Sequence, residues 1–380
     1  MFEGFSQAFV QELQEIKNSY YKLFLITLFP LLCFGLVIAI FYKGVAYEMP
    51  VVVVDNDNSK LSRKLLFNIN ASPTIDIVAQ KTDTHAAMKL LHSSQVYAVL
   101  EIPKHFAKDV YLKKQPSLNV MLNTQYILIG KILKAALLES VSSSAAEVEF
   151  VNNLTQTKNP KSALGMVAPV QLYVVPFFNQ YKNYFYFLVS ALLPSIWQIF
   201  IVIATIVSFG STFKEKKEKA FFGTQHIGAK IVGKMFPYTI AYMILGVGYL
   251  FYIYGFEGWY FEGSFLFMVF AMFVTVIAYQ GVSLLFFISG FDYARTLSLG
   301  AVYTAPAFAF LGVTFPIYNM NEFALFWRDM LPVSYLMEIQ ISQANYGAPL
   351  GSELHKVAAL LIFWLVFIPV VWRMKQRLQR

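Results

Sequence analysis

The segment 55–59 carries side chains that could bind a metal ion. Its sequence, DNDNS, places oxygen atoms at alternate positions, as at the start of a calcium-binding loop. However, position six of such a loop is Lys60, where glycine is needed, and position twelve is Leu66, where a bidentate glutamate is needed. The pattern therefore favours a turn between a strand and a helix, in which Asn58 or Ser59 caps the helix.

Other motifs of ligand binding or catalysis are incomplete. His85 and His92 lie seven residues apart, about two helical turns, which exceeds the spacing of a chelating pair. Residues 228–234 satisfy G-x-x-x-x-G-K, but Met235 replaces the Ser or Thr that holds magnesium, and no strand precedes the loop. The lone cysteine, Cys33, excludes a disulfide framework and a Cys-based zinc site within one chain. We therefore expect no metal site and no catalysis, so any ATP-driven work needs another polypeptide.

A dense run of charges that ends in an aromatic pair is the most informative group. It combines both signs of charge with two phenylalanines and a Gly-Thr turn, and so offers ionic contacts and an apolar knob to a partner protein. The alternative is a run that only retains positive charge on one side of a membrane. The residues expected to contact a partner are Lys214, Glu215, Lys216, Lys217, Glu218, Lys219, Phe221, Phe222, Gly223 and Thr224.

The composition requires that a membrane surround the elements that carry these groups. Hydrophobic residues make up 57% of the 380 residues and charged residues only 14%, against a usual ~25%. The mean hydropathy is +0.53, and a soluble fold could not bury that much apolar surface. The net charge of +8 lies beside apolar runs rather than on polar, basic faces, which disfavours nucleic-acid binding.

Six uncharged intervals are long enough to cross a hydrocarbon core of ~30 Å, which needs roughly 20 apolar residues in a helix. We therefore expect a polytopic α-helical membrane protein with six transmembrane helices. The last interval is the shortest, and its flanking basic residues must extend towards the interfaces. The intervals are bounded by Lys22 and Lys43, Lys182 and Lys214, Lys234 and Glu257, Glu262 and Asp292, Arg295 and Glu322, and Lys356 and Arg373.

The distribution of Lys and Arg orients these helices, because short cytoplasmic segments retain positive charge. With the N-terminus inside, the short outer segments hold only Lys43, Arg328 and Lys356. Both termini are therefore expected to be cytoplasmic, and the long segment between the first two helices to lie outside. Glu3 and Glu12 precede the first helix and no small-x-small cleavage site follows it, so we expect an anchor rather than a signal peptide.

Residues 1–20 are expected to form an interfacial helix on the cytoplasmic leaflet. Apolar residues recur at spacings of three and four, and polar residues lie opposite them, as in a helix that rests on a membrane surface. An amphipathic leader without function is the alternative. The apolar stripe is Phe5, Phe9, Leu13, Ile16 and Tyr20, and the opposite face carries Gln7, Glu12 and Gln14.

The segment 44–182 is the only part that resembles a soluble domain. Strand signals alternate with helical patterns, and this alternation predicts βαβ units with a small, mostly parallel sheet. The expected strands are 50–55, 75–78, 96–102 and 117–122, and the expected helices are 59–70, 84–92 and 127–155. The predicted order along the chain is the interfacial helix 1–20, the first transmembrane helix 21–43, the α/β extracytoplasmic domain 44–182, and helices two to six in 183–380, with a cytoplasmic loop 211–234 and an outer hairpin 317–355.

Five segments, in this order along the chain, resemble motifs of the membrane permeases of ABC-2-type ABC transporters, of the exporter kind with a large outer domain. The resemblance covers nearly the whole chain. The segments are 52–63, similar to VVDxDxSxLSR; 95–106, similar to xVxAVLxIPxxF; the charged run ending in Gly223 and Thr224, similar to the EKExGT coupling element; Gly233 with Lys234, similar to the GK that opens the third helix; and 312–335, similar to GxxFPIxxMP…PxTY. Departures are His226, near where glutamate commonly follows Gly-Thr, and Asn321, where proline commonly follows methionine.

The resemblance implies a permease of the exporter kind in the bacterial inner membrane. It implies a second membrane subunit, identical or related, and two cytoplasmic ATPase subunits that hold ATP and Mg, while this chain binds no cofactor. ATP binding would then shift the population between inward-facing and outward-facing states. A periplasmic adaptor is a further candidate partner. The alternatives are a permease for a lipid-linked polymer and a non-transporting receptor or scaffold whose outer domain binds a partner.

Polar residues within the spans are candidates for a transport pathway. Acidic and basic residues are not expected at mid-membrane, which disfavours a proton relay and favours lipidic, amphipathic or drug-like cargo. Each polar residue could instead hold helices together. The pathway candidates are Gln198, Thr205, Tyr279, Gln280, Ser283, Tyr303 and Thr304.

The outer hairpin is expected to contain two short apolar stretches, 323–327 and 335–339, that lie in the outer leaflet or dip back into it. Such a hairpin could act as a gate or as an ordinary lid. Charged side chains on it, including Asp329, are expected to point to headgroups or to a pathway exit. The residues proposed for an outer gate are Phe315, Pro316, Arg328, Pro332 and Glu338.

Overall fold

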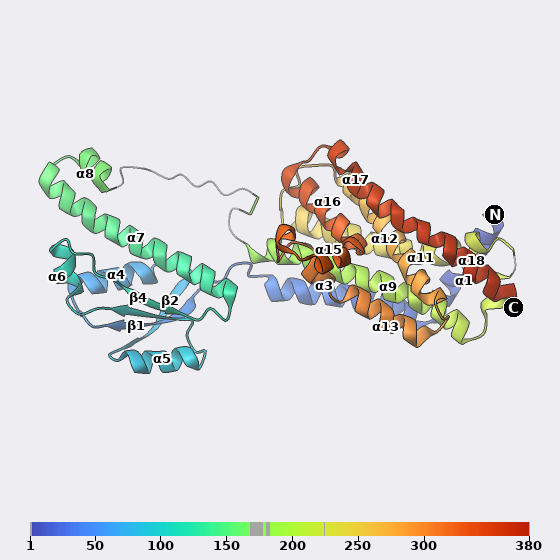
Figure 1. Cartoon of the computed structure of the whole chain (residues 1–380), viewed down its shortest axis with the longest axis horizontal. Coiled ribbons are helices and arrows are strands. Elements are labelled where there is room, and N and C mark those ends of the chain that lie inside the picture. Colours follow the sequence, from blue (N-terminus) through green and yellow to red (C-terminus); the bar gives the residue numbers. More distant parts are fainter. Residues whose placement is uncertain (1, 168–177, 180–182, 224, 380) are drawn as a thin grey trace. The chain divides into compact units, whose positions relative to one another are not determined.

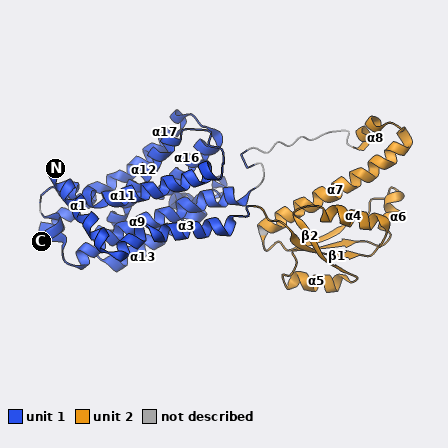
Figure 2. Ribbon diagram, turned by 180° about the vertical axis from the view of Figure 1, so that it is seen from behind, with its two compact units in different colours: residues 1–44, 177–380 blue, residues 45–176 orange. Residues whose placement is uncertain are grey.

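A computed structural model describes residues 2–167, 178–179, 183–223 and 225–379 (Figure 1). The chain divides into two compact units (Figure 2). The first, which we call the membrane unit, comprises Met1–Gly44 and Phe177–Arg380, and the second, which we call the inserted unit, comprises Val45–Pro176. The inserted unit lies within the predicted domain 44–182, and its position relative to a membrane stays a prediction.

The membrane unit contains, among the described residues, five helices that are long and apolar enough to cross a membrane. They are Tyr20–Phe41, formed by α2 (Tyr20–Ile26) and α3 (Leu28–Phe41); Phe185–Lys214, formed by η1 (Phe185–Val189) and α9 (Ser190–Lys214); Ile227–Phe256, formed by α11 (Ile227–Leu250) and η2 (Phe251–Phe256); α12 (Phe265–Ile288); and Leu350–Gln379, formed by α17 (Leu350–Ile362), η4 (Phe363–Val366) and α18 (Phe367–Gln379). Each lies on one of the predicted intervals.

The remaining predicted interval, between Arg295 and Glu322, is not one continuous helix. It holds α13 (Tyr293–Thr304) and the single turn α14 (Ala307–Phe310). Pro306 lies between them and cannot donate a helical hydrogen bond, and Gly312 then takes a φ of +81°, which L side chains rarely adopt. The described residues therefore supply five candidate spans, and the sixth stays a prediction.

The outer hairpin contains η3 (Ile317–Asn319), α15 (Glu322–Asp329) and α16 (Pro332–Tyr346). Most side chains of α16 are buried, and it packs against α9, α12 and α17. The Val333 backbone N–H donates to the Tyr279 hydroxyl at 3.1 Å, and the Ser264 N–H donates to Gln343 Oε1 at 3.0 Å. Because these contacts follow α12 along its length, α16 lies within the helix bundle and not on its surface.

The membrane unit closes on itself at the point where the inserted unit leaves it. The Tyr184 backbone N–H donates to the carbonyl oxygen of Gly44. Gly44 has a φ of +64°, and a β-carbon there would collide with the Asn183 side chain. The chain before the insertion and the chain after it are therefore joined by a direct backbone hydrogen bond.

The inserted unit contains a sheet with the strand order β2-β1-β3-β4 among the described residues. β1 pairs in parallel with β2 and β3, and β4 pairs antiparallel with β3, so the sheet is mostly parallel, as predicted. The strands are β1 (Met49–Asp55), β2 (Ile75–Lys81), β3 (Ala98–Ile102) and β4 (Asn119–Leu122), and the helices are α4 (Lys60–Asn70), α5 (Thr84–His92), α6 (Phe106–Tyr111), α7 (Ile127–Thr157) and α8 (Pro160–Val167).

Helices cover both faces of this sheet, as Figure 1 shows. Val51 and Val53 of β1 face α4 and α7, whereas Val52 and Val54 face α5. All four valines are buried, which is why the strand is a continuous β-branched run and does not alternate with polar residues.

The turn after β1 uses its oxygens within the chain. Asp55 Oδ1 accepts from the backbone N–H groups of Asp57 and Asn58 at 3.0 Å, and Asp55 Oδ2 accepts from the Ser62 hydroxyl at 2.7 Å. Ser59 and Ser62 form a capping box at the start of α4. The interpretation of this segment as a strand-to-helix turn capped by Ser59 is therefore confirmed.

Candidate functional site

The charged run connects the end of α9 to the start of α11 through α10 (Glu218–Phe222). The side chains of Lys214, Lys216 and Lys219 are exposed. The Lys217 ammonium lies 2.5 Å from the Glu215 carboxylate, and this contact lowers the pKa of Glu215 and raises the pKa of Lys217. The run therefore presents a mixed, mainly positive surface. Gly223 takes a φ of +58°, and Thr224 lies outside the described residues.

The two phenylalanines of this run point into the chain, so the expectation of an apolar knob for a partner is wrong. Phe221 is 3% exposed and Phe222 is 0% exposed. The ring of Phe222 stacks on Phe209, with the ring centroids 5.8 Å apart. The two rings share one apolar cluster with the ends of α9, α11, α12 and α18. Both rings are therefore covered by other parts of the chain.

Glu12 of α1 (Phe2–Asn18) is also buried, although the sequence pattern placed it on the polar face. The buried face of α1 consists of Gly4, Ala8, Glu12 and Ile16, and it packs along α11. At the crossing, a β-carbon on Gly233 would lie 3.1 Å from the β-carbon of Ala8 and would collide with a backbone carbonyl of α1. Small residues on both helices therefore allow the close approach that buries the carboxylate.

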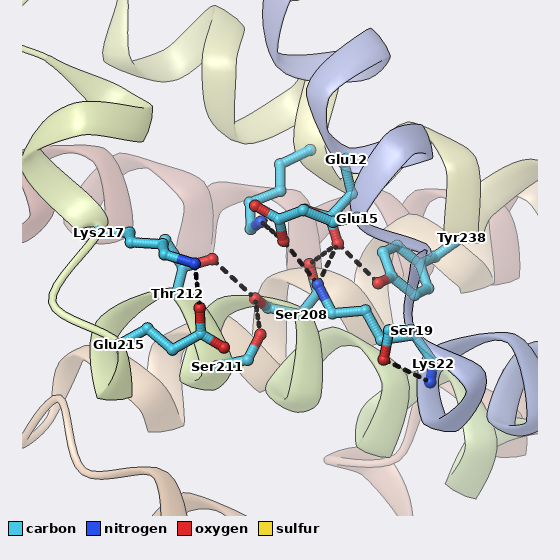
Figure 3. A network of polar contacts seen from close by, with 11 residues as sticks. Glu12, Glu15, Ser19, Lys22, Ser208, Ser211, Thr212, Glu215, Lys217 and Tyr238 are labelled. Carbon is cyan, nitrogen blue, oxygen red and sulfur yellow. Dashed lines mark hydrogen bonds and ion pairs between the residues drawn. The ribbon is translucent and has the colours of Figure 1, made fainter. Parts of the chain in front are cut away.

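The Glu12 carboxylate accepts four hydrogen bonds, most of which can be followed in Figure 3. Its Oε1 accepts from Lys22 Nζ at 3.1 Å, from Ser208 Oγ at 2.9 Å and from the Tyr238 hydroxyl at 2.7 Å. Its Oε2 accepts from Lys234 Nζ. These partners belong to α2, α9 and α11. One carboxylate therefore joins α1 to three other helices.

Charge in this network is balanced. Lys22 Nζ also contacts Glu15 Oε2 at 2.8 Å, so two carboxylates face two ammonium groups. Burial alone would raise the pKa of Glu12, but the charges of Lys234 and Lys22 outweigh it and hold that pKa below its ordinary value. Buried charges are costly unless they are paired and hydrogen-bonded, and here both conditions are met.

Lys234 extends the network to the charged run. Its ammonium lies 4.0 Å from the centroid of the Phe221 ring, within the range of a cation–π contact. Lys234 lies within α11, so residues 228–234, which match G-x-x-x-x-G-K, are helical. The Lys234 ammonium is held by Glu12. The segment therefore has neither the loop nor the free lysine that a phosphate site needs, and the motif instead builds the crossing of α1 and α11.

The pathway candidates are buried and use polar groups within the chain. Gln198 Nε2 donates to the Thr304 carbonyl at 3.2 Å, and Gln280 Oε1 accepts from the Thr239 hydroxyl at 3.0 Å. Tyr303 donates to the Met330 carbonyl at 2.5 Å. The hydroxyls of Thr205, Ser283 and Thr304 donate to carbonyls of their own helices, and Tyr279 accepts from Val333. The contacts of Gln198, Gln280, Tyr303 and Tyr279 join different elements and favour the alternative that such residues hold helices together. The hydroxyl bonds of the other three residues stay within one helix and do not bear on it.

Two of the outer-gate candidates, Arg328 and Glu338, tie the hairpin together. Arg328 is 5% exposed and pairs with Glu338, so its side chain is engaged within the chain, and its expected position at headgroups or at a pathway exit stays a prediction. Pro332 occupies the first turn of α16, where its missing N–H costs no hydrogen bond. Phe315 is exposed, and Pro316 precedes η3. The ion pair fixes α15 to α16 because the two charges come from different helices.

Residues 22–373 match the family of ABC-2 family transporter proteins. The match extends over most of the chain, so the chain belongs to this family. Curated proteins give no match to the chain. The family is a membrane component of ABC transporters, which implies association with the membrane and with an ATP-binding subunit. The apolar helices agree with this assignment, and the chain is a multi-pass membrane component of such a transporter.

Proposed function

We propose that the chain is the permease subunit of an exporter that moves hydrophobic or amphipathic molecules out of the cytoplasm or the inner leaflet. A separate ATPase subunit, which holds ATP and Mg, supplies the energy, and a second permease copy or paralogue supplies the other wall of the pathway. The observation that carries this proposal is the anchoring of the charged run. Its apolar underside is locked into the ends of four helices, while its four lysines and Glu215 are exposed.

This anchoring suits the run to transmit force. Single exposed ion pairs contribute only ~0–1 kcal/mol, so a partner needs several charges of the run at once. A displacement of α10 cannot be absorbed locally, because Phe222 is packed against α9 and Phe221 contacts Lys234 of α11. A partner that binds two arrangements of these helices with different affinity shifts the population between them.

The basic residues at one end of the membrane unit support the proposal that both termini are cytoplasmic. Ala8 of α1, Phe222 of α10 and Met374 of α18 belong to one apolar cluster, so the N-terminal helix, the charged run and the C-terminal helix end on the same side. This end also carries Lys216, Lys219 and the basic residues of α18. By the positive-inside rule that side is the cytoplasm.

The apolar surface of the helices that would line a pathway supports the proposal of hydrophobic or amphipathic cargo. The buried polar side chains of α9, α12 and α13 are largely engaged in hydrogen bonds within the chain. A pathway along these helices therefore presents apolar surface and few free hydrogen-bonding groups. Such a surface suits molecules that already partition into a lipid bilayer.

Co-purification with and without a charge reversal tests the proposal. The chain is purified from its own cells in a mild detergent, and the ATP hydrolysis that accompanies it is measured. The triple change Lys216→Glu, Lys217→Glu and Lys219→Glu should reduce this hydrolysis at least tenfold. Lys108→Glu, Lys131→Glu and Lys134→Glu, which alter exposed lysines of the inserted unit by the same charge, should leave it unchanged.

The possible results separate the alternatives. Undiminished hydrolysis in the first triple variant would mean that the run is only an anchor. Absence of any associated hydrolysis in the unaltered chain would favour a receptor or scaffold.

A further inference from the structure

The inserted unit contains a cavity of about 640 Å³ between α4, α6 and α7. Its floor is apolar. Leu65 and Phe106 are buried there, and Leu118, Val141 and Val148 are partly exposed to the cavity. Small-molecule sites typically have volumes of roughly 300–1,000 Å³ and mainly apolar linings, so both the size and the lining match such a site.

The cavity exists because α7 extends beyond the end of the sheet on which it packs. Leu133 and Leu137, in the first half of this 31-residue helix, are buried in the core of the sheet. The strands have only four to seven residues, so the sheet ends before the helix does. Val141 and Val148 therefore continue the apolar face of α7 beyond the sheet. α6 has only six residues and leaves this face partly uncovered.

Charges around the cavity are unequal. Lys64 of α4 pairs with Glu147 of α7 at 2.6 Å, and the hydrogen bond from Lys64 lowers the pKa of Glu147. This pair neutralises one carboxylate of the rim. Lys113 and Lys114 then stand on the turn after α6, both exposed, opposite Glu149 alone among the remaining carboxylates of the lining. Lys114 lies 3.8 Å from Asp109, at the limit of an ion pair.

We propose that this cavity binds an amphipathic anion, with its apolar chain along Leu65, Phe106 and Val141 and its charged head beside Lys113 and Lys114. The apolar floor supplies affinity in proportion to the area that it removes from water. The two lysines supply the preference for negative charge. Binding in this cavity is a property of the inserted unit and stands whether or not the bound molecule is the exported one.

Protection of an introduced cysteine tests the site in the full chain. Cys33 is the lone cysteine, so Cys33→Ala provides a background without thiols. Ala145→Cys then places a thiol on the exposed wall of the cavity, and Lys89→Cys places a control thiol on α5, on the other face of the sheet. Both variants are reconstituted in phosphatidylcholine nanodiscs, and the rate of maleimide modification is measured with and without 11-(dansylamino)undecanoate.

We expect saturating probe to slow modification at Ala145→Cys at least tenfold and to leave Lys89→Cys unchanged. Adding Lys113→Glu and Lys114→Glu should raise the half-protecting probe concentration at least tenfold, and decyltrimethylammonium should not protect. Absence of protection, equal protection of both thiols, or insensitivity to the lysine changes would overturn the proposal. Nanodiscs with phosphatidylglycerol and no probe identify the source of the anion: protection there assigns the occupant to membrane lipid, and its absence assigns it to a free amphiphile.

Discussion

Glu12 holds four helices together through one carboxylate, so its neutralisation should be costly. Glu12→Gln leaves the buried ammonium groups of Lys22 and Lys234 without their full counter-charge. Removing one partner of a buried pair typically costs ~3–5 kcal/mol. We expect a clear fall in the unfolding temperature of the purified chain. Glu3→Gln on the exposed face of the same helix is the matched control and should have little effect.

A double-mutant cycle isolates the interaction between Glu12 and Lys234 from the effects of their other contacts. Lys234→Met removes the other charge, so the loss in Glu12→Gln with Lys234→Met should be smaller than the sum of the two single losses. Strictly additive losses would show that Glu12 and Lys234 do not interact.

The pH dependence of stability follows from the same carboxylate. The pKa of Glu12 is lowered in the folded chain, so its contribution is present above the ordinary value of 4.5 and is lost as the pH falls through the folded pKa. The difference in unfolding temperature between the unaltered chain and Glu12→Gln should therefore be constant from pH 7 to 5 and shrink below about 4.5. A difference that persists unchanged to pH 3 would contradict this assignment.

Sequence reasoning could not place Glu12, and the reason is physical. The apolar stripe that includes Phe5 and Phe9 follows from the hydrophobicity of the residues. The face of α1 that packs against α11 is instead determined by side-chain size, because Gly4 and Ala8 are small enough to allow a close approach. The principal partner of Glu12 is Lys234, which is far away in the sequence and is recognisable only once α1 and α11 lie together. The segment that matches G-x-x-x-x-G-K lies within α11, and its part in the crossing of α1 and α11 does not follow from the motif.

At the scale of elements, the burial of α10 changes what its aromatic residues should do. Phe222→Ala removes a fully buried ring, and such changes cost ~3–5 kcal/mol. We expect a lower unfolding temperature even without any partner. Lys219→Ala, on the exposed side of the same short helix, should be nearly neutral. Equal stability of Phe222→Ala and Lys219→Ala in the purified chain would mean that the ring is free to contact a partner.

Elements with a strong local signal were predicted well. The four strands and the helices α4, α5 and α7 agree with their expected positions, because alternation, β-branched runs and caps such as Ser59 are local properties. The short helices α6 and α8 have no counterpart among the predicted elements. The interval after Arg295 was predicted as one helix from its lack of charge alone. Absence of charge does not report helix continuity, and Pro306 and Gly312 end the helix within the interval.

At the scale of the whole molecule, the lone cysteine allows a direct test of orientation. In a Cys33→Ala background, Lys158→Cys should react in intact cells with an impermeant maleimide, because it lies in the inserted unit, which is predicted to be outside. Lys217→Cys should react only after the cells are opened. Labelling of Lys217→Cys in intact cells would reverse the orientation of every helix.

Because Gly44 and Tyr184 are joined by a hydrogen bond, the inserted unit can be removed or exchanged for another domain. Since the membrane unit is already closed at this junction, a short Gly-Ser linker can take the place of residues 45–176 without pulling the two helices apart. A chain shortened in this way should still insert and unfold near its original temperature. The same junction would accept a foreign domain whose termini lie close together, so that new binding properties could be grafted onto an unaltered transport core.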